Sequence, residues 1–160
     1  MVAGTAQGPA PTQSPDFALA RFHTDGTLDL SFNPGTGADN WVETISIQSD
    51  GKIIIGGYLT IYNGVTVNRI VRLNADGTID PSFNMGIKAN DVIYTTMLQS
   101  DGKIFIASES GKVVVLPPGG GLEAMAINDL QDSIYATPAL VGNRIYIRTL
   151  NALYCFGAKR

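Results

Sequence analysis

Apolar residues occur along the chain in short runs, and most of these runs alternate with polar residues at a period of two. This alternation is typical of half-buried β-strands, and no long stretch follows the 3.6-residue period of a helix. Gly, Asp, Asn and Pro separate the runs, as tight turns require. We therefore predict an all-β chain whose short antiparallel strands cover 17–22, 28–32, 42–48, 52–58, 69–74, 78–83, 92–98, 103–107, 112–116, 122–128, 134–140, 144–148 and 152–156.

The strand pattern repeats along the chain. The stretch Gln48–Ile53 (QSDGKI) recurs as Gln99–Ile104, 51 residues later. Residues 21–29 match residues 72–80 at the same offset. A fixed repeat of this length, filled by about four short strands, is the signature of a β-propeller blade. Within a blade, the Asp-Gly pair of QSDGKI is expected to form the turn between the first two strands.

The strands add up to about three blades of four antiparallel strands, in one domain over 16–157 that follows a flexible leader at 1–15. The third blade lacks its outer strand, and the strand 28–32 is a spare outer strand. Propellers have about 4–8 blades, so about three would leave apolar faces uncovered. We therefore expect a homodimer that forms a six-bladed ring through strand exchange, with a nine-bladed trimer as the alternative. The expected blade boundaries are near 33–83, 84–128, and 129–157 plus 28–32.

Composition narrows the classes of partner. Hydrophobic residues make up 44% of the 160 positions, which is enough for a buried core. The net charge is −3 with Lys and Arg scattered, so we expect no nucleic-acid partner. No apolar run approaches the ~20 residues of a membrane helix, and the leader lacks the charged and apolar regions of a signal peptide. The single cysteine, Cys155, excludes an intrachain disulfide and is expected to be a buried, inert thiol.

Two family resemblances follow from these motifs. The segment from about 16 to 107 resembles the delta-60 repeat family of bacterial β-propellers through DFALARF, ADGTIDPSFN, QSDGKIIIGGY, YNG and NRIVRLN. From about 108 to 157, ESGKVVVL, IYATPALVGNRIYIRT and LYCFG are similar to repeats of the pyrroloquinoline-quinone-enzyme-like superfamily. The tryptophan-docking motif of that superfamily is absent, so the resemblance implies the fold and not the quinone cofactor. The parent families imply secreted or cell-envelope bacterial relatives, and their junction suggests a natural recombinant or an engineered chimera.

Candidate catalytic and metal-binding residues do not converge in the sequence, so we predict that the chain is not an enzyme and holds no cofactor or metal. His23 precedes an Asp-Gly turn at the position that Asn74 holds in the next repeat, which favours a turn residue. The turns at Asp25 and Asp76 contain half of a calcium loop and lack its upstream carboxylates. Their carboxylates are expected to accept backbone N–H groups of the turn instead.

One loop face remains as the candidate ligand site. Successive strands of a blade run in opposite directions. The loops between blades and the loops after each second strand therefore lie on the same face, opposite the Asp-Gly turns. The aromatic and amide side chains expected there are Asn40, Trp41, Tyr58, Tyr62 and Asn63. A glycan or a protein is the expected class of ligand, and packing between blades is the favoured alternative for Trp41 and Tyr58. The predicted function is a non-enzymatic self-assembling scaffold; the alternative is a fragment of a secreted bacterial surface protein that binds through this face.

Overall fold

The computed structural model forms an all-β fold of antiparallel sheets, and it describes residues 2–3, 19–83, 91–119, 123–142 and 144–157. The first large sheet contains β3 (Val42–Ile47), β4 (Ile53–Gly57) and β7 (Ile70–Leu73). The second contains β8 (Ile93–Leu98), β9 (Ile104–Ser108), β10 (Lys112–Leu116) and β11 (Ala126–Asp129). The third contains β12 (Ala139–Val141), β13 (Arg144–Arg148) and β14 (Leu153–Gly157). Two small pairs complete the described part: β1 (Val2–Ala3) with β2 (Leu19–Ala20), and β5 (Ile61–Tyr62) with β6 (Val65–Thr66).

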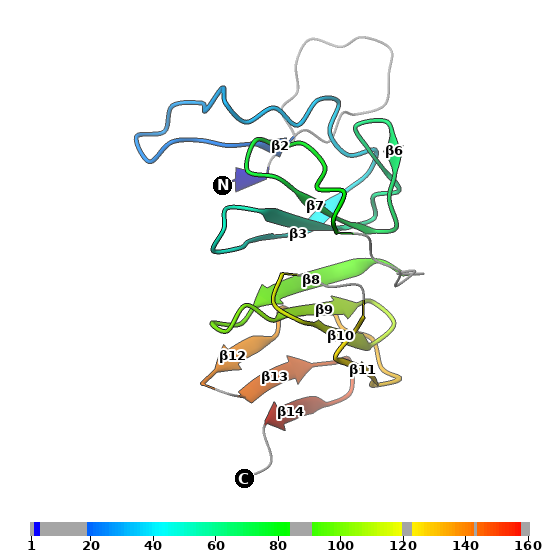
Figure 1. Cartoon of the computed structure of the whole chain (residues 1–160). Helices are drawn as coiled ribbons and strands as arrows, with labels where there is room; N and C mark the ends of the chain where they lie inside the picture. The colour runs from blue at the N-terminus through cyan, green and yellow to red at the C-terminus, as the bar shows by residue number, and fades with distance from the viewer. Residues whose placement is uncertain (1, 4–18, 84–90, 120–122, 143, 158–160) are drawn as a thin grey trace.

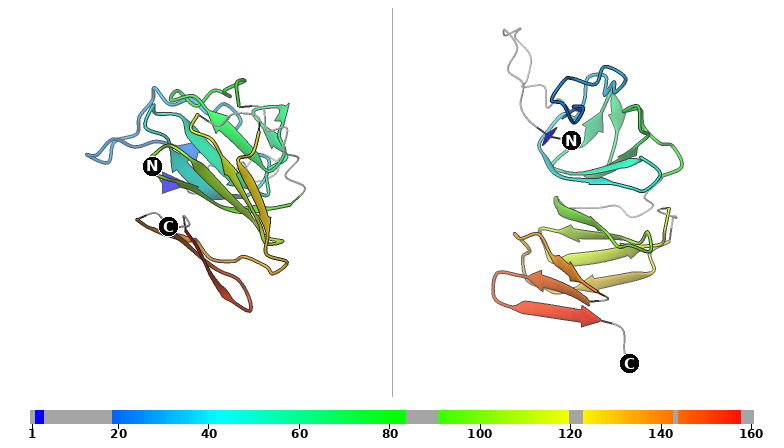
Figure 2. Two further views of the ribbon diagram at one scale, coloured as in Figure 1. Left: turned by 60° about the horizontal axis from the view of Figure 1, so that its bottom comes forward. Right: turned by 90° about the vertical axis from the view of Figure 1, so that its left-hand side faces the viewer.

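The three large sheets stack face to face in chain order, as blades of a propeller do (Figure 1). The segment around β2 lies at one end of the stack, and β14 lies at the other end (Figure 2). Side-chain hydroxyls join the inner strands β3 and β8. The Thr44 Oγ1 atom lies 3.0 Å from Thr96 Oγ1 and accepts the Thr96 N–H at 2.9 Å. These short polar side chains allow the two inner strands to approach closely.

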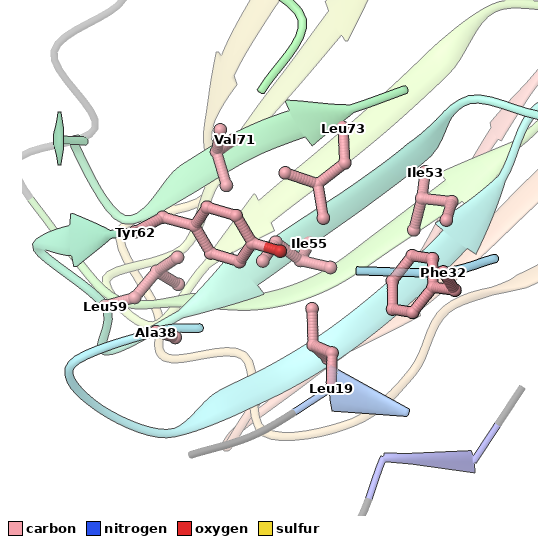
Figure 3. Close-up of a cluster of buried hydrophobic side chains, with 9 residues drawn as sticks. All are labelled: Leu19, Phe32, Ala38, Ile53, Ile55, Leu59, Tyr62, Val71 and Leu73. Carbon is pink, nitrogen blue, oxygen red and sulfur yellow. The ribbon is translucent and has the colours of Figure 1, made fainter. Parts of the chain in front are cut away.

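Apolar side chains fill the space between successive sheets. The strand β4 is buried on both faces, as its continuous apolar run predicts. Because side chains alternate across a strand, Ile53 and Ile55 point to one side of the sheet and Ile54 points to the other. The cluster of buried residues on the outer side of the first sheet is shown in Figure 3 and consists of Leu19, Phe32, Ala38, Ile53, Ile55, Leu59, Tyr62, Val71 and Leu73.

The expected outer strands are much shorter than the pattern predicts. The run 78–83 contributes one bridge, between Leu73 and Ile79, and the run 28–32 likewise contributes only the bridge between Phe22 and Leu28. The carboxylate of Asp80 explains the first case, because it accepts the backbone N–H of Ser82 at 3.0 Å and closes a turn where a ladder would continue. The equivalent Asp29 accepts the N–H of Ser31 at 2.9 Å. The outer strand of the second sheet begins at Ala126, later than predicted.

Two further elements differ from the predicted pattern. The third sheet begins at Ala139 and not at Ile134, which is instead fully buried and donates its N–H to the Glu109 carbonyl at 3.1 Å. The predicted loop 60–68 contains the hairpin β5–β6, whose turn residues Asn63 and Gly64 have φ angles of 47° and 77°. A two-residue type I′ turn requires positive φ at both positions, so the Asn-Gly pair is the cause of the hairpin. Of the predicted leader 1–15, the described residues are Val2–Ala3, and 84–90 also lie outside the described ranges.

A buried ion pair fastens the end of the first sheet. The Arg72 Nε atom donates to Asp80 Oδ2 at 2.8 Å, and Lys52 Nζ donates to the same oxygen at 2.7 Å. The guanidinium also lies 4.7 Å from the ring centroid of Phe83, a cation–π distance. Burial opposes ionisation of Asp80, but the hydrogen bonds from Lys52 and Ser82 and the charge of Arg72 outweigh it and lower the pKa. The motif repeats 51 residues earlier, where Arg21 Nε donates to Asp29 Oδ2 at 2.7 Å.

We expect the stability of the fold to fall between about pH 4 and pH 2. The hydroxyl and backbone N–H of Ser31, together with Arg21, lower the pKa of Asp29 from 3.8 to about 2. A carboxyl whose pKa is depressed by folding stabilises the fold fully above its unfolded pKa, and this contribution is lost as the pH falls through the folded pKa. Melting temperatures measured from pH 7 to pH 2 should therefore be flat at first and then decline. The Asp29→Asn variant should show a shallower decline, and an identical acid slope would contradict this assignment.

Candidate functional site

The five side chains predicted on the loop face separate into two groups. Trp41 and Tyr58 meet edge to face, with ring centroids 5.9 Å apart, where β3 begins and β4 ends, at the end of the hairpin opposite its turn. Trp41 is 59% exposed, and the Asn40 side chain accepts its backbone N–H at 2.8 Å. These three residues therefore lie together at the end of the first sheet.

Tyr62 and Asn63 belong to the β5–β6 hairpin and not to this group. Tyr62 is completely buried, and its hydroxyl donates to the Gly77 carbonyl at 3.1 Å. Its placement at a ligand face is therefore corrected: the ring is part of the core, and a surface ligand cannot contact it. Burial raises the pKa of its phenol well above the usual range. The Asn63 side chain stays at the surface and accepts the N–H of Thr36 at 3.3 Å.

The structure adds two tyrosines that the sequence pattern does not single out. The hydroxyl of Tyr94, at the start of β8, lies 3.4 Å from the hydroxyl of Tyr58. Tyr94 then meets Tyr135 edge to face, with centroids 5.5 Å apart. Trp41, Tyr58, Tyr94 and Tyr135 thus form a continuous row from the end of the first sheet, past the second, to the segment between β11 and β12, which we call the aromatic row. Tyr94 stands five residues before the second QSDGKI copy, and this register is the sequence signal for its position.

Charged side chains flank the aromatic row. The Tyr135 hydroxyl donates to Glu109 Oε1 at 3.4 Å, and the Arg69 guanidinium donates to the Tyr58 carbonyl. The hydrogen bond with Tyr58 is the main cause of a raised pKa at Tyr94, and the negative charges of Glu109 and Glu43 add to it. The Tyr94 phenol therefore stays neutral at physiological pH and can act as a hydrogen-bond donor and acceptor. Ring faces beside fixed hydroxyls suit binding by stacking and hydrogen bonding.

Other residues that could carry chemistry have structural roles. His23 lies at its turn, where its carbonyl accepts the Gly26 N–H at 3.0 Å. Asp25 and Asp76 accept the N–H groups of Thr27 and Thr78, at 2.9 Å and 3.0 Å, as predicted. Cys155 is exposed on β14, which corrects the expectation of a buried thiol. Within the described ranges no three His, Cys, Asp or Glu side chains converge as metal ligands, and no helix is long and apolar enough to cross a membrane.

Comparison with known proteins supports the propeller repeats. The model of the family "domain of unknown function (DUF5122) beta-propeller" matches residues 1–32 and 48–83, somewhat less than half of the chain. No curated protein sequence matches. The chain is therefore similar to propeller repeats in sequence as well as in the stacking of its sheets.

Among solved structures, PorZ of Porphyromonas gingivalis is similar with a TM-score of 0.55 and 14% identity. That match covers 86% of this chain and 19% of the PorZ chain, so the chain spans about a fifth of its length. PorZ is described as an essential bacterial surface component of the type-IX secretion system. Virginiamycin B lyase of Staphylococcus aureus matches with a TM-score of 0.45 and 16% identity over 78% of this chain and 44% of that one. BamB of Moraxella catarrhalis matches with a TM-score of 0.43 and 18% identity. That match covers 72% of this chain and 31% of the BamB chain. At these identities the PorZ match concerns the fold alone.

Proposed function

We propose that the chain is a non-enzymatic β-propeller scaffold that completes its ring by binding a second copy of itself. The observation that supports this most directly is the incomplete third sheet. Among the described residues it has three strands, and nothing pairs with the outer edge of β14. In the second sheet the equivalent strand β10 is covered by β11 through four residue pairs, from Lys112–Asp129 to Val115–Ala126.

Hydrogen-bond alternation shows which groups of β14 point outward. The Thr149 N–H bonds to the Ala152 carbonyl at 2.9 Å, which makes residues 149 and 152 a hydrogen-bonded pair. Hydrogen-bonded and non-bonded pairs alternate along an antiparallel ladder, so Tyr154 and Phe156 also bond to β13. The backbone groups of Leu153, Cys155 and Gly157 consequently point away from the sheet. An open edge of this kind promotes pairing with another chain.

The expected result in solution is a particle of twice the chain mass of 17.0 kDa. Two chains of about three blades would give about six blades, within the usual range for propellers. Light scattering coupled to gel filtration measures this mass directly. A single-chain mass over a wide concentration range would contradict the proposed function.

We also propose that the two halves have different parents, a delta-60 repeat and a pyrroloquinoline-quinone-enzyme-like repeat. The hairpin β5–β6 supports this proposal, because it follows β4 in the first repeat, whereas β10 follows β9 at once in the second. The offset between equivalent hairpins supports it too, since Arg144 follows Lys103 by 41 residues and not by 51. A natural protein whose sequence is continuous across residues 90–125 would argue against an engineered junction.

The aromatic row supports a second candidate function, binding of a glycan or a protein at the loop face. We expect Trp41→Ala to weaken such binding, because Trp41 is the most exposed ring of the row. Ile127→Ala is the matched control, since Ile127 is similarly exposed but lies on β11, away from the row. A glycan array probed with the wild type and both variants measures the effect. A hit that Trp41→Ala leaves intact would exclude the aromatic row as its site.

A further inference from the structure

Equivalent residues of the two first repeats differ sharply in burial. Leu73 is completely buried and Ile79 is partly buried, and both pack in the cluster on the outer side of the first sheet. Their equivalents 51 residues earlier are Phe22 and Leu28, which are 45% and 51% exposed. The local structure is the same in both places, because Phe22 bridges Leu28 as Leu73 bridges Ile79. Phe22 and Leu28 therefore form an apolar face that is built like the packed one, but no core cluster of the described residues includes them.

A groove at the other end of the stack has the matching character. It lies between the second and third sheets, beside the open edge of β14, and has a volume of about 220 Å³. Its lining is apolar apart from one amide, and the lining residues are Phe105, Val113, Val115, Asn128, Ile145, Phe156 and Gly157. Asn128 belongs to β11, the outer strand of the second sheet. The groove is thus the space that an additional outer strand of the third sheet would cover.

The apolar face and the groove belong to opposite ends of the molecule. Figure 1 places the segment around β2 beyond the first sheet and β14 beyond the second sheet, so one chain cannot bring its own face to its own groove. In a pair of copies, the apolar face of each chain can dock in the groove of the other chain. Such a head-to-tail contact closes when the rotation between copies is a half turn.

We infer that the groove between the second and third sheets is a docking site for the face of a second copy that carries Phe22 and Leu28. This inference rests on the proposed function and names the surfaces that would produce it. Leu30 belongs to the same contact, since it is 84% exposed two residues beyond Leu28. No charged side chain lines the groove, so apolar residues can enter it without a desolvation cost for charge.

Two variants test the two surfaces separately. Phe22→Lys places a charge on the face, and Val115→Lys places one in the groove. Each is expected to weaken dimerisation by at least about 100-fold, as measured by analytical ultracentrifugation. Val65→Lys is the matched control, because Val65 is 52% exposed on β6 and belongs to neither surface. Circular dichroism and melting temperature confirm that each variant is folded.

Mixing the two variants decides whether the contact is head to tail. A dimer of one Phe22→Lys chain and one Val115→Lys chain retains one intact contact, from the unaltered face to the unaltered groove. An equimolar mixture should therefore dimerise more tightly than either variant alone. If each variant is a monomer and the mixture is no tighter, the inference is wrong. If the wild type is a dimer and the Phe22→Lys or Leu30→Lys variant is also a dimer, the inferred docking site is wrong. The proposed function then still stands. A monomeric wild type overturns both the inference and the proposed function.

Discussion

Replacing Arg72 by Ala is expected to destabilise the fold by about 3–5 kcal/mol, because removing one partner of a buried ion pair leaves the other charge uncompensated. Arg72 and Asp80 are both buried. The side chain also donates to Ser82 Oγ at 3.1 Å and to the Gly119 carbonyl, so it joins the end of the first sheet to the loop after β10. Lys52 remains beside Asp80 in the variant, and this places the expected loss at the lower end of the range.

The repeat supplies the matched control for this prediction. Arg21 makes the same contacts to Asp29 and Ser31, but its side chain is 27% exposed against 4% for Arg72. Exposed ion pairs contribute about 0–1 kcal/mol, so Arg21→Ala should have a much smaller effect. Urea unfolding of both variants, at one protein concentration because association shifts apparent stability, measures the difference. Equal losses of unfolding free energy in the two variants would show that burial does not determine how much the Arg–Asp pair stabilises the fold.

The repeat could be predicted from sequence because its strongest signals are local. An Asp-Gly turn followed by a continuous apolar run identifies β4 and β9 wherever they occur, and the offset of 51 follows from counting. The outer strands could not be predicted in the same way. Alternation at 78–83 resembles a strand, but the Asp80 carboxylate competes for the backbone N–H of Ser82. That competition depends on Arg72 and Lys52 holding the carboxylate in place, which the local sequence does not show.

The candidate site was harder to predict than the fold, because its members come from different repeats. Trp41 and Tyr58 adjoin one hairpin, so their proximity follows from the pairing of β3 with β4. Tyr94 and Tyr135 reach them only through the stacking of successive sheets. The position of Tyr135 could not be predicted for a second reason. Its segment reads as a strand, whereas Ile134 is drawn into the core and leaves Tyr135 exposed at the surface.

Replacing Tyr62 by Ala is expected to cost about 3–5 kcal/mol, the usual loss for a fully buried aromatic ring. Figure 3 shows the ring among Leu59, Ile55 and Val71, where its removal would leave a cavity on the outer side of the first sheet. Tyr62→Phe keeps the ring and loses the hydrogen bond to Gly77, so its cost should be about 0.5–1.5 kcal/mol. Thermal or urea unfolding of the two variants separates the contribution of the ring from that of the hydroxyl. A loss for Tyr62→Ala no larger than for Tyr62→Phe would contradict the placement of the ring.

This stability effect determines how binding data on the protein should be interpreted. A motif such as Tyr-Asn-Gly in a polar loop invites mutation of its tyrosine as a ligand contact. Because Tyr62 supports the core on which the first sheet rests, Tyr62→Ala would weaken binding at any surface by destabilising the fold. Trp41→Ala should instead change stability by about 0.5–1.5 kcal/mol, the value of its edge-to-face contact with Tyr58. Loss of binding in Trp41→Ala with an intact melting transition would therefore report the aromatic row itself, and the same loss in Tyr62→Ala would not.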